Sequence, residues 1–296
     1  MKKNIIVVTG GAGFVGSNLI KSLYNFNKYQ IISLDNYSSG KKSNHIISKN
    51  VKYIRGETKN IKKLLNKYRY KINAIFHFGE FSRIFQSFKY FNKCYEYNII
   101  GSKEVFNFCL NNKIKLIYSA TSASFGNSEK KNLSPYAFTK SKNLELLENL
   151  RRWFNFKFEI IYFYNLYGEN QISDGEMATV IGIFENQYKK NLPLTVVKPG
   201  SQKRRFTIIS DTIDLCIKAW KKNKCKHYSI SGKENLTILQ VAKMFKNEIK
   251  FLPPRLGERY SSELVKMNLS KKVINYTSNK TLKKYIIDYK NKISCR

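Results

Sequence analysis

Residues 5–16 read IIVVTGGAGFVG, and this stretch constrains the fold more than any other part of the chain. The β-branched run Ile5 to Val8 is typical of a parallel strand that is buried on both faces. Gly10, Gly13 and Gly16 follow it, where a backbone can turn tightly or approach another group closely. An apolar stripe at helical spacing comes next, at Val15, Leu19, Ile20 and Leu23. The stretch therefore predicts a strand, a tight turn and a helix.

A second apolar run, Ile31 to Leu34, ends in Asp35. This is the distance at which a dinucleotide site places an acid for the adenosine ribose. The N–H groups at the start of the first helix would face a pyrophosphate. A carboxylate at Asp35 would accept hydrogen bonds from both ribose hydroxyls and repel a 2′-phosphate. The two runs together predict that the chain binds NAD rather than NADP.

The rest of the chain alternates between strand and helix patterns, which is typical of a doubly wound sheet. Candidate strands lie at 4–9, 30–35, 51–54, 73–78, 114–119 and 158–164. We expect an α/β fold with a doubly wound parallel (Rossmann) sheet in an NAD-binding domain at 1–165. A smaller, less regular substrate lobe at 166–296 would begin with a helix at about 176–190, and some of its C-terminal segments could pack back on the first domain.

Composition narrows the class of protein. The chain has 54 Lys and Arg against 20 Asp and Glu, a net charge of +34, but the basic residues are spread evenly and form no tail. We interpret them as a solvated surface and expect no nucleic-acid partner. No apolar run approaches the ~20 residues of a membrane span, so we expect no membrane partner. Five scattered cysteines without metal-ligand spacing indicate reduced thiols, a cytoplasmic enzyme and no metal site.

Candidate catalytic residues lie in two segments. Tyr136 and Lys140 are four residues apart at the start of a predicted helix, so they share a helical face. An ammonium near the phenol would lower the pKa of Tyr136 and make it usable as a base. Thr121 lies in a serine-rich segment after the predicted strand 114–119, at the edge where such sheets bind ligands.

These segments resemble the extended short-chain dehydrogenase/reductase family of nucleotide-sugar epimerases and dehydratases, and within it most closely the UDP-glucose 4-epimerases. The resemblance runs in the family's order from residue 4 to about 260. It is carried by the segments TGGAGFVGSN, LDNYSSG, IFHFGE, YSATSASFG, SPYAFTK, YFYNLYG and PGSQKRRF.

The resemblance implies a role for each matching position. It makes Thr121, Tyr136 and Lys140 the catalytic residues. Cofactor contacts would come from Gly10, Gly13, Phe14, Val15, Gly16, Asp35, Asn36, Glu57, Thr58, Phe78, Gly79, Asn98, Tyr136 and Lys140. The sugar nucleotide would be held by Asn165, Arg205, Arg255 and Glu258.

Two departures from the family pattern bear on the reaction. Dehydratases of the family follow the catalytic Thr with Asp-Glu, and decarboxylases keep the Glu, whereas this chain has Ser122-Ala123. Glu80 stands where small or uncharged residues are common, and would contact substrate or pair with Arg83.

The resemblance thus implies an NAD-dependent epimerase of a nucleotide diphospho-sugar, at C4 through a 4-keto sugar. Alternatives are another member of the family (a reductase, an epimerase at another carbon or a dehydratase) and, more remotely, a non-catalytic NAD-binding or nucleic-acid-binding protein. Relatives commonly form homodimers through helix pairs. Here Leu144, Leu147, Leu150 and the helix at Phe106–Leu110 could build such an interface or belong to the core.

Overall fold

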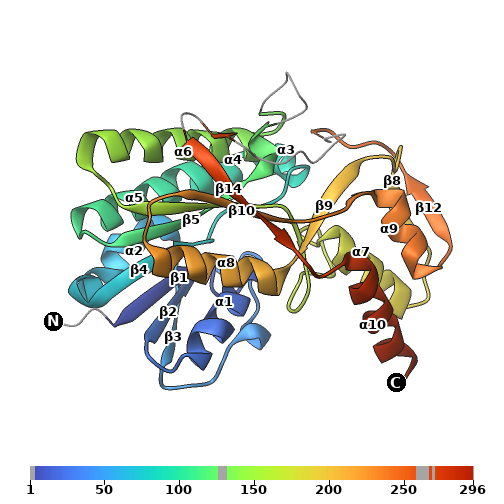
Figure 1. Ribbon diagram of the computed structural model, residues 1–296, viewed down its shortest axis with the longest axis horizontal. Helices are drawn as coiled ribbons and strands as arrows, with labels where there is room; N and C mark the ends of the chain where they lie inside the picture. Colours follow the sequence, from blue (N-terminus) through green and yellow to red (C-terminus); the bar gives the residue numbers. More distant parts are fainter. Residues whose placement is uncertain (1–3, 126–131, 258–266, 269–270, 296) are drawn as a thin grey trace.

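The computed structural model describes residues 4–125, 132–257, 267–268 and 271–295. A nine-stranded sheet dominates it, in the order β13-β14-β10-β6-β5-β4-β1-β2-β3 (Figure 1). The pairings from β14 to β3 are parallel and the short edge strand β13 is antiparallel. Its strands are β1 (Ile5–Thr9), β2 (Gln30–Asp35), β3 (Val51–Arg55), β4 (Ile72–His77), β5 (Lys115–Thr121), β6 (Phe158–Phe163), β10 (His227–Gly232), β13 (Met267–Asn268) and β14 (Lys271–Ser278). The predicted doubly wound sheet is confirmed.

Helices cover both faces of this sheet (Figure 1). One layer contains α2 (Ile61–Leu65), α5 (Ser102–Asn111) and α6 (Pro135–Phe154), and the opposite layer contains α1 (Phe14–Asn25) and α8 (Ile209–Lys222). The β-branched side chains of β1 pack against both helix layers, because Ile5 and Val7 belong to one core cluster and Ile6 and Val8 belong to the other. Such a strand has no polar face, which is why its sequence is continuously apolar.

A smaller lobe packs at the carboxyl edge of the sheet. Its helices are α7 (Val180–Lys189), α9 (Ile238–Phe245) and α10 (Leu282–Ser294), and its strands are β7 (Asn165–Tyr167), β8 (Leu194–Val197), β9 (Lys203–Ile208), β11 (Asn235–Thr237) and β12 (Ile249–Leu252). The expected helix at about 176–190 begins only at Val180, because the Thr179 hydroxyl accepts the Gly182 N–H and caps it. The division at residue 165 stays a prediction. Two strands of the large sheet, β10 and β14, follow residue 165 in the sequence, so C-terminal segments do pack back on the first domain.

Three short segments complete the arrangement around the site: α3 (Gln86–Lys89), α4 (Phe91–Tyr95) and the π-helical turn η4 (Glu96–Gly101). They lie between β4 and α5 and pack against α6. Three leucines of α6 that were candidates for a subunit interface, Leu144, Leu147 and Leu150, are buried in the core of the chain itself, as is Phe106. They pack between α6, α5 and the sheet, so they are not available to a second subunit.

Candidate functional site

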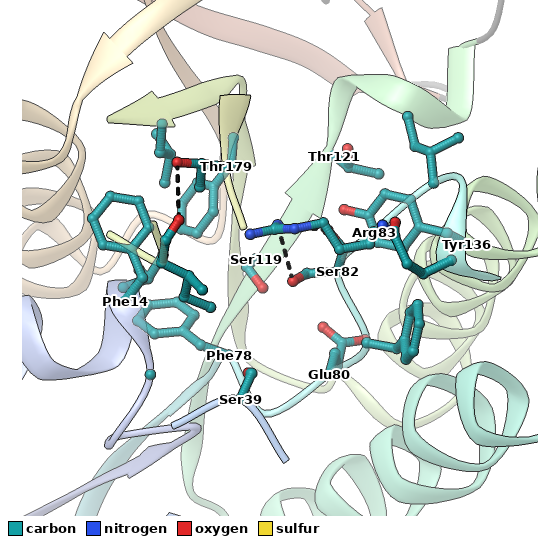
Figure 2. Close-up of a pocket in the computed structure, with 18 of the residues that line it drawn as sticks. Phe14, Ser39, Phe78, Glu80, Ser82, Arg83, Ser119, Thr121, Tyr136 and Thr179 are labelled. Carbon is teal, nitrogen blue, oxygen red and sulfur yellow. Dashed lines mark hydrogen bonds between the residues drawn. The ribbon is translucent and has the colours of Figure 1, made fainter. Parts of the chain in front are cut away.

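The carboxyl edge of the sheet and the smaller lobe enclose a cavity of about 460 Å³. It lies where the strand order reverses between β1 and β4, the point at which doubly wound sheets bind ligands. The cavity runs from the turn after β1, past the ends of β4 and β5, to α7 and β9 in the smaller lobe. Figure 2 shows side chains from both lobes meeting in it.

The glycine turn after β1 forms one end of the cavity. Gly10 has a φ of +69°, and a Cβ there would come within 2.9 Å of the Gly79 backbone. A Cβ on Gly16 would come within 2.1 Å of the Gly10 carbonyl oxygen. Glycine is therefore required at both positions by the close approach of backbone to backbone. The cradle that results leaves room for a phosphate against the N-terminus of α1.

Asp35 lies beside this turn at the end of β2. Its carboxylate accepts the N–H of Ala12 at 2.9 Å and the N–H of Tyr37 at 2.7 Å. Burial raises the pKa of Asp35, and these two backbone donors act in the opposite direction. The carboxylate lines the cavity and keeps further lone pairs for a ribose. Phe14, Val15, Asn36 and Thr58, the other candidates in this part of the site, line it too.

Glu57, predicted near the adenine, also lines the cavity, and Lys59 lies 2.9 Å from its carboxylate. Phe78 and Gly79, which stay predictions for the nicotinamide side, line the cavity beyond it. Asn98 differs, because its amide holds the backbone of Phe81: the Phe81 N–H donates to Oδ1 at 2.7 Å, and Nδ2 donates to the Phe81 carbonyl at 3.1 Å. This fully buried side chain shapes the loop after β4 and is not part of the cavity wall that the described residues form.

Tyr136 lies in the first turn of α6, which Pro135 opens and the Ser134 hydroxyl caps. Thr121 is the last residue of β5, and its hydroxyl is hydrogen-bonded to the Tyr136 phenol. Both side chains face the cavity (Figure 2). The structure thus brings together two of the three candidate catalytic residues across 15 residues of sequence.

The third candidate, Lys140, lies one turn further along α6 and is buried. Its ammonium donates to the carbonyl of Ser119 and to the Glu80 carboxylate, the latter at 2.5 Å. Glu80 is equally buried and also accepts hydrogen bonds from Tyr118 at 2.9 Å, Ser102 at 3.0 Å and Asn143 at 3.2 Å. Glu80 therefore pairs with Lys140 and not with Arg83.

This pairing changes the electrostatics expected for Tyr136. The pKa of Tyr136 is raised to about 12, chiefly by burial and also by the negative charge of Glu80, while the Thr121 hydrogen bond and the charge of Arg83 act in the opposite direction. The expectation that Lys140 brings this pKa toward neutrality is therefore wrong for the chain by itself, because Glu80 neutralises the ammonium. Another positive charge is needed to ionise the phenol.

In the smaller lobe Arg204 lines the cavity, whereas Arg205, the arginine predicted from the sequence, does not. Arg205 turns away and donates to the carbonyls of Lys233 at 2.7 Å and Gly232 at 3.3 Å. Its neighbour Arg204 is buried and lines the cavity. Neighbouring residues of a strand point to opposite faces, so only one of an Arg-Arg pair on β9 can face the ligand. The sequence signal was present in this pair, but it did not tell which arginine faces inward.

The other substrate candidates are placed as follows. Asn165 and Arg255 line the cavity; Asn165 donates to the Arg205 carbonyl at 3.1 Å, and the Arg255 guanidinium lies 5.3 Å from the ring centre of Phe85. Glu258 lies outside the described residues. Arg83 and Thr179, which were not proposed as site residues, also line the cavity.

None of the helices in the described ranges is long and apolar enough to cross a membrane. Within the same ranges no group of three or more His, Cys, Asp or Glu side chains is placed to hold a metal ion.

Comparison with known proteins agrees with this geometry. Residues 6–231 match the model of the NAD-dependent epimerase/dehydratase family. A putative UDP-glucose 4-epimerase of Methanocaldococcus jannaschii is 29% identical over 86% of this chain and 88% of its own length. An ADP-L-glycero-D-manno-heptose-6-epimerase of Brachyspira hyodysenteriae is 31% identical over 71% and 70%.

Solved structures share the fold at lower identity. A UDP-glucose 4-epimerase of Thermotoga maritima, crystallised with UDP-glucose, superposes with a TM-score of 0.82 at 23% identity, covering 97% of this chain and 99% of its own. A UDP-glucuronic acid 4-epimerase of Bacillus cereus, solved with UDP-glucuronic acid and NAD, gives 0.83 at 23% identity over 98% and 99%. The glycine cradle and Asp35 fit the family's cofactor, NAD. The chain belongs to the NAD-dependent epimerase/dehydratase family.

Proposed function

We propose that this enzyme epimerises a nucleotide diphospho-sugar at C4, of the UDP-glucose/UDP-galactose type. The observation that carries the proposal is the hydrogen-bonded pair of Thr121 and Tyr136, which faces the cavity next to the predicted nicotinamide side. Two UDP-glucose-type epimerases among its relatives and structural neighbours support the choice of substrate class.

The acidic groups of the cavity argue against dehydration. In the described part of the chain, the acids that line it are Asp35, Glu57 and Glu80. Each is engaged elsewhere: Asp35 with backbone N–H groups, Glu57 with Lys59 and Glu80 with Lys140. Beside Thr121, Ser122 and Ala123 offer no carboxylate. Elimination of water needs an acid and a base at the sugar besides Tyr136, and among the described residues no carboxylate stands ready for either role there.

Tyr136 would take the proton from the sugar 4-hydroxyl, and Thr121 would donate a hydrogen bond to the same oxygen and stabilise its developing charge. Bound NAD would supply the acceptor for the hydride from C4 of the sugar and would bring a positive charge near the phenol. The resulting 4-keto sugar would turn about its diphosphate link, and Tyr136 would return the proton once hydride reaches the other face.

Arg204 and Arg255 would hold the diphosphate while the sugar turns. Both line the cavity from the smaller lobe, and a guanidinium offers paired N–H donors to phosphate oxygens. Arg204 thus takes the role that the sequence suggested for Arg205. Fixing the nucleotide end leaves the sugar free to present either face.

The test of the proposal is product analysis with matched variants. Wild type should interconvert UDP-glucose and UDP-galactose, or their C6-acid counterparts, without net consumption of NAD. Tyr136→Phe and Thr121→Val should lose turnover by about 100-fold or more while still binding UDP. Normal turnover by Tyr136→Phe would exclude the mechanism.

We propose further that the enzyme is a cytoplasmic homodimer. The surface that supports this is apolar and lies over α4, η4 and the start of α6: Phe91, Tyr95, Ile100 and Phe138 are each at least 40% exposed. Burying such a surface is favourable. Light scattering should give a dimer for wild type and a monomer for Phe91→Glu; a monomeric wild type would refute the assignment.

A further inference from the structure

Arg83 brings a positive charge into the cavity that the proposed mechanism does not use. It lies on the loop between β4 and α3, and its guanidinium ends in the middle of the cavity, between the side that carries Thr121 and Tyr136 and the side that carries Phe14 (Figure 2).

The hydrogen bonds of Arg83 go to neutral oxygens. Nε and Nη2 donate to the carbonyl of Met177 at 2.9 and 2.5 Å. Nη1 donates to the carbonyl of Ser82 at 3.0 Å and, at the longer distance of 3.5 Å, to the Ser82 hydroxyl. A guanidinium has five N–H groups, so one on Nη2 is left over and the second on Nη1 makes only this long bond. No carboxylate in the described ranges forms an ion pair with it.

This distinguishes Arg83 from the other cations of the site. Lys140 is neutralised by Glu80, and Arg204 and Arg255 lie in or beside the smaller lobe, where the diphosphate is proposed to bind. Arg83 lies close enough to Tyr136 for its charge to lower the pKa of the phenol. The N–H groups that do not bond to carbonyls therefore lie on the sugar side of the site, next to the reacting hydroxyl.

A ligand that fills the cavity would remove the water that solvates these N–H groups. A charge taken out of water is costly unless a counter-ion replaces the water. A carboxylate has two oxygens that can accept these N–H groups of Nη1 and Nη2 in parallel, the one on Nη1 in place of its long bond to the Ser82 hydroxyl. In a hexuronic acid this carboxylate is attached to C5, the neighbour of the C4 carbon on which Tyr136 would act.

We propose that Arg83 binds a carboxylate of the sugar, so that within the glucose/galactose series the site prefers the nucleotide diphospho-hexuronic acid to the neutral hexose. This inference rests on the proposed epimerase function and names its substrate class. Met177 and Ser82 hold the guanidinium in place, so the site is formed before the substrate arrives.

The experiment compares UDP-glucuronic acid, UDP-glucose and UDP as ligands and substrates of the NAD-loaded enzyme. The variants are wild type, Arg83→Met, Arg83→Lys and the control Arg152→Met, an exposed arginine of α6 that bonds only to Asn149 within the described residues. Wild type should favour UDP-glucuronic acid by about 10- to 100-fold in kcat/KM and in affinity, the range of a hydrogen bond to a charged group. Arg83→Met should remove this preference, Arg83→Lys should keep part of it, and affinity for UDP should not change.

The outcomes separate this inference from the function on which it rests. Equal or better use of UDP-glucose by wild type overturns the inference and leaves the epimerase proposal standing. An equal loss on both sugars in Arg83→Met, with a shifted pH profile, also overturns it, because Arg83 would then serve the Tyr136 phenolate. Arg83-dependent binding of the acid without turnover supports the inference and refutes the epimerase. If neither sugar nucleotide binds, the carboxylate site and the epimerase function are both refuted.

Discussion

The buried pair of Glu80 and Lys140 allows a stability prediction with a definite magnitude. Their side chains are 3% and 4% exposed and their charged atoms are 2.5 Å apart. Glu80→Gln keeps the shape and removes the charge, which leaves the Lys140 ammonium buried without a counter-ion. Removing one partner of such a pair costs about 3–5 kcal/mol.

The lower end of this range is the better expectation. The Lys140 ammonium also lies 4.4 Å from the ring centre of Tyr118, and this contact offsets part of the loss. We therefore expect Glu80→Gln to lower the free energy of unfolding by about 3 kcal/mol, which corresponds to roughly 5 °C in Tm for a chain of 296 residues. Urea unfolding followed by circular dichroism measures it.

The pH dependence of the variant adds a second test. Burial lowers the pKa of Lys140, and Glu80 opposes this effect. Without Glu80 the folded-state pKa falls further below the unfolded value, so Glu80→Gln should lose stability as pH falls through that lower pKa. Its deficit relative to wild type should therefore shrink as pH rises from 7 toward 10.

A matched control lies on the same helix. Lys142 and Glu145 of α6 form an exposed pair, with side chains 50% and 54% exposed. Glu145→Gln should change stability by less than about 1 kcal/mol. The double variant Glu80→Gln/Lys140→Met should recover part of the loss, since neither charge is then left alone. A Glu80→Gln protein as stable as Glu145→Gln would refute the reasoning.

Further predictions follow from other contacts. His77 is buried and its pKa is lowered to about 4, so it should stay neutral in NMR titrations above that pH, and folding should lose about 3 kcal/mol as pH falls from 6.5 to 4; a titration near 6.5 would contradict this. Arg204→Met should weaken UDP binding about tenfold or more in calorimetry, whereas Arg205→Met should not; the reverse result would restore the arginine suggested by sequence. Asp35→Ser should lower the affinity for NAD about 10- to 100-fold and the affinity for NADP by less. An unchanged preference for NAD over NADP would show that Asp35 does not bind the ribose.

Much of the fold could be predicted because its signals are local. The run Ile5 to Val8 is apolar on both faces of the strand, and the glycines after it are required by backbone contacts within a short stretch. Tyr136 and Lys140 share a helical face because of their spacing alone. Interactions of this kind depend on residues near one another in sequence.

The parts that sequence did not predict depend on distant contacts or on orientation. Glu80 meets Lys140 across 60 residues, and this pairing offsets the expected effect of the ammonium on the pKa of Tyr136. The inward arginine of β9 depends on strand orientation, which an Arg-Arg pair does not reveal. The leucines of α6 have the same apolar character whether they face the core or a second subunit.

The measurement that tests the central claim most directly is product analysis with deuterium-labelled substrate. The purified enzyme, with NAD bound, is incubated with sugar nucleotide labelled at C4, using UDP-glucose and UDP-glucuronic acid in parallel. We predict a C4 epimer that keeps the label at C4, in wild type and not in Tyr136→Phe. An epimer that has lost its label to solvent, or the absence of any C4 epimer from an NAD-loaded enzyme, would contradict the account.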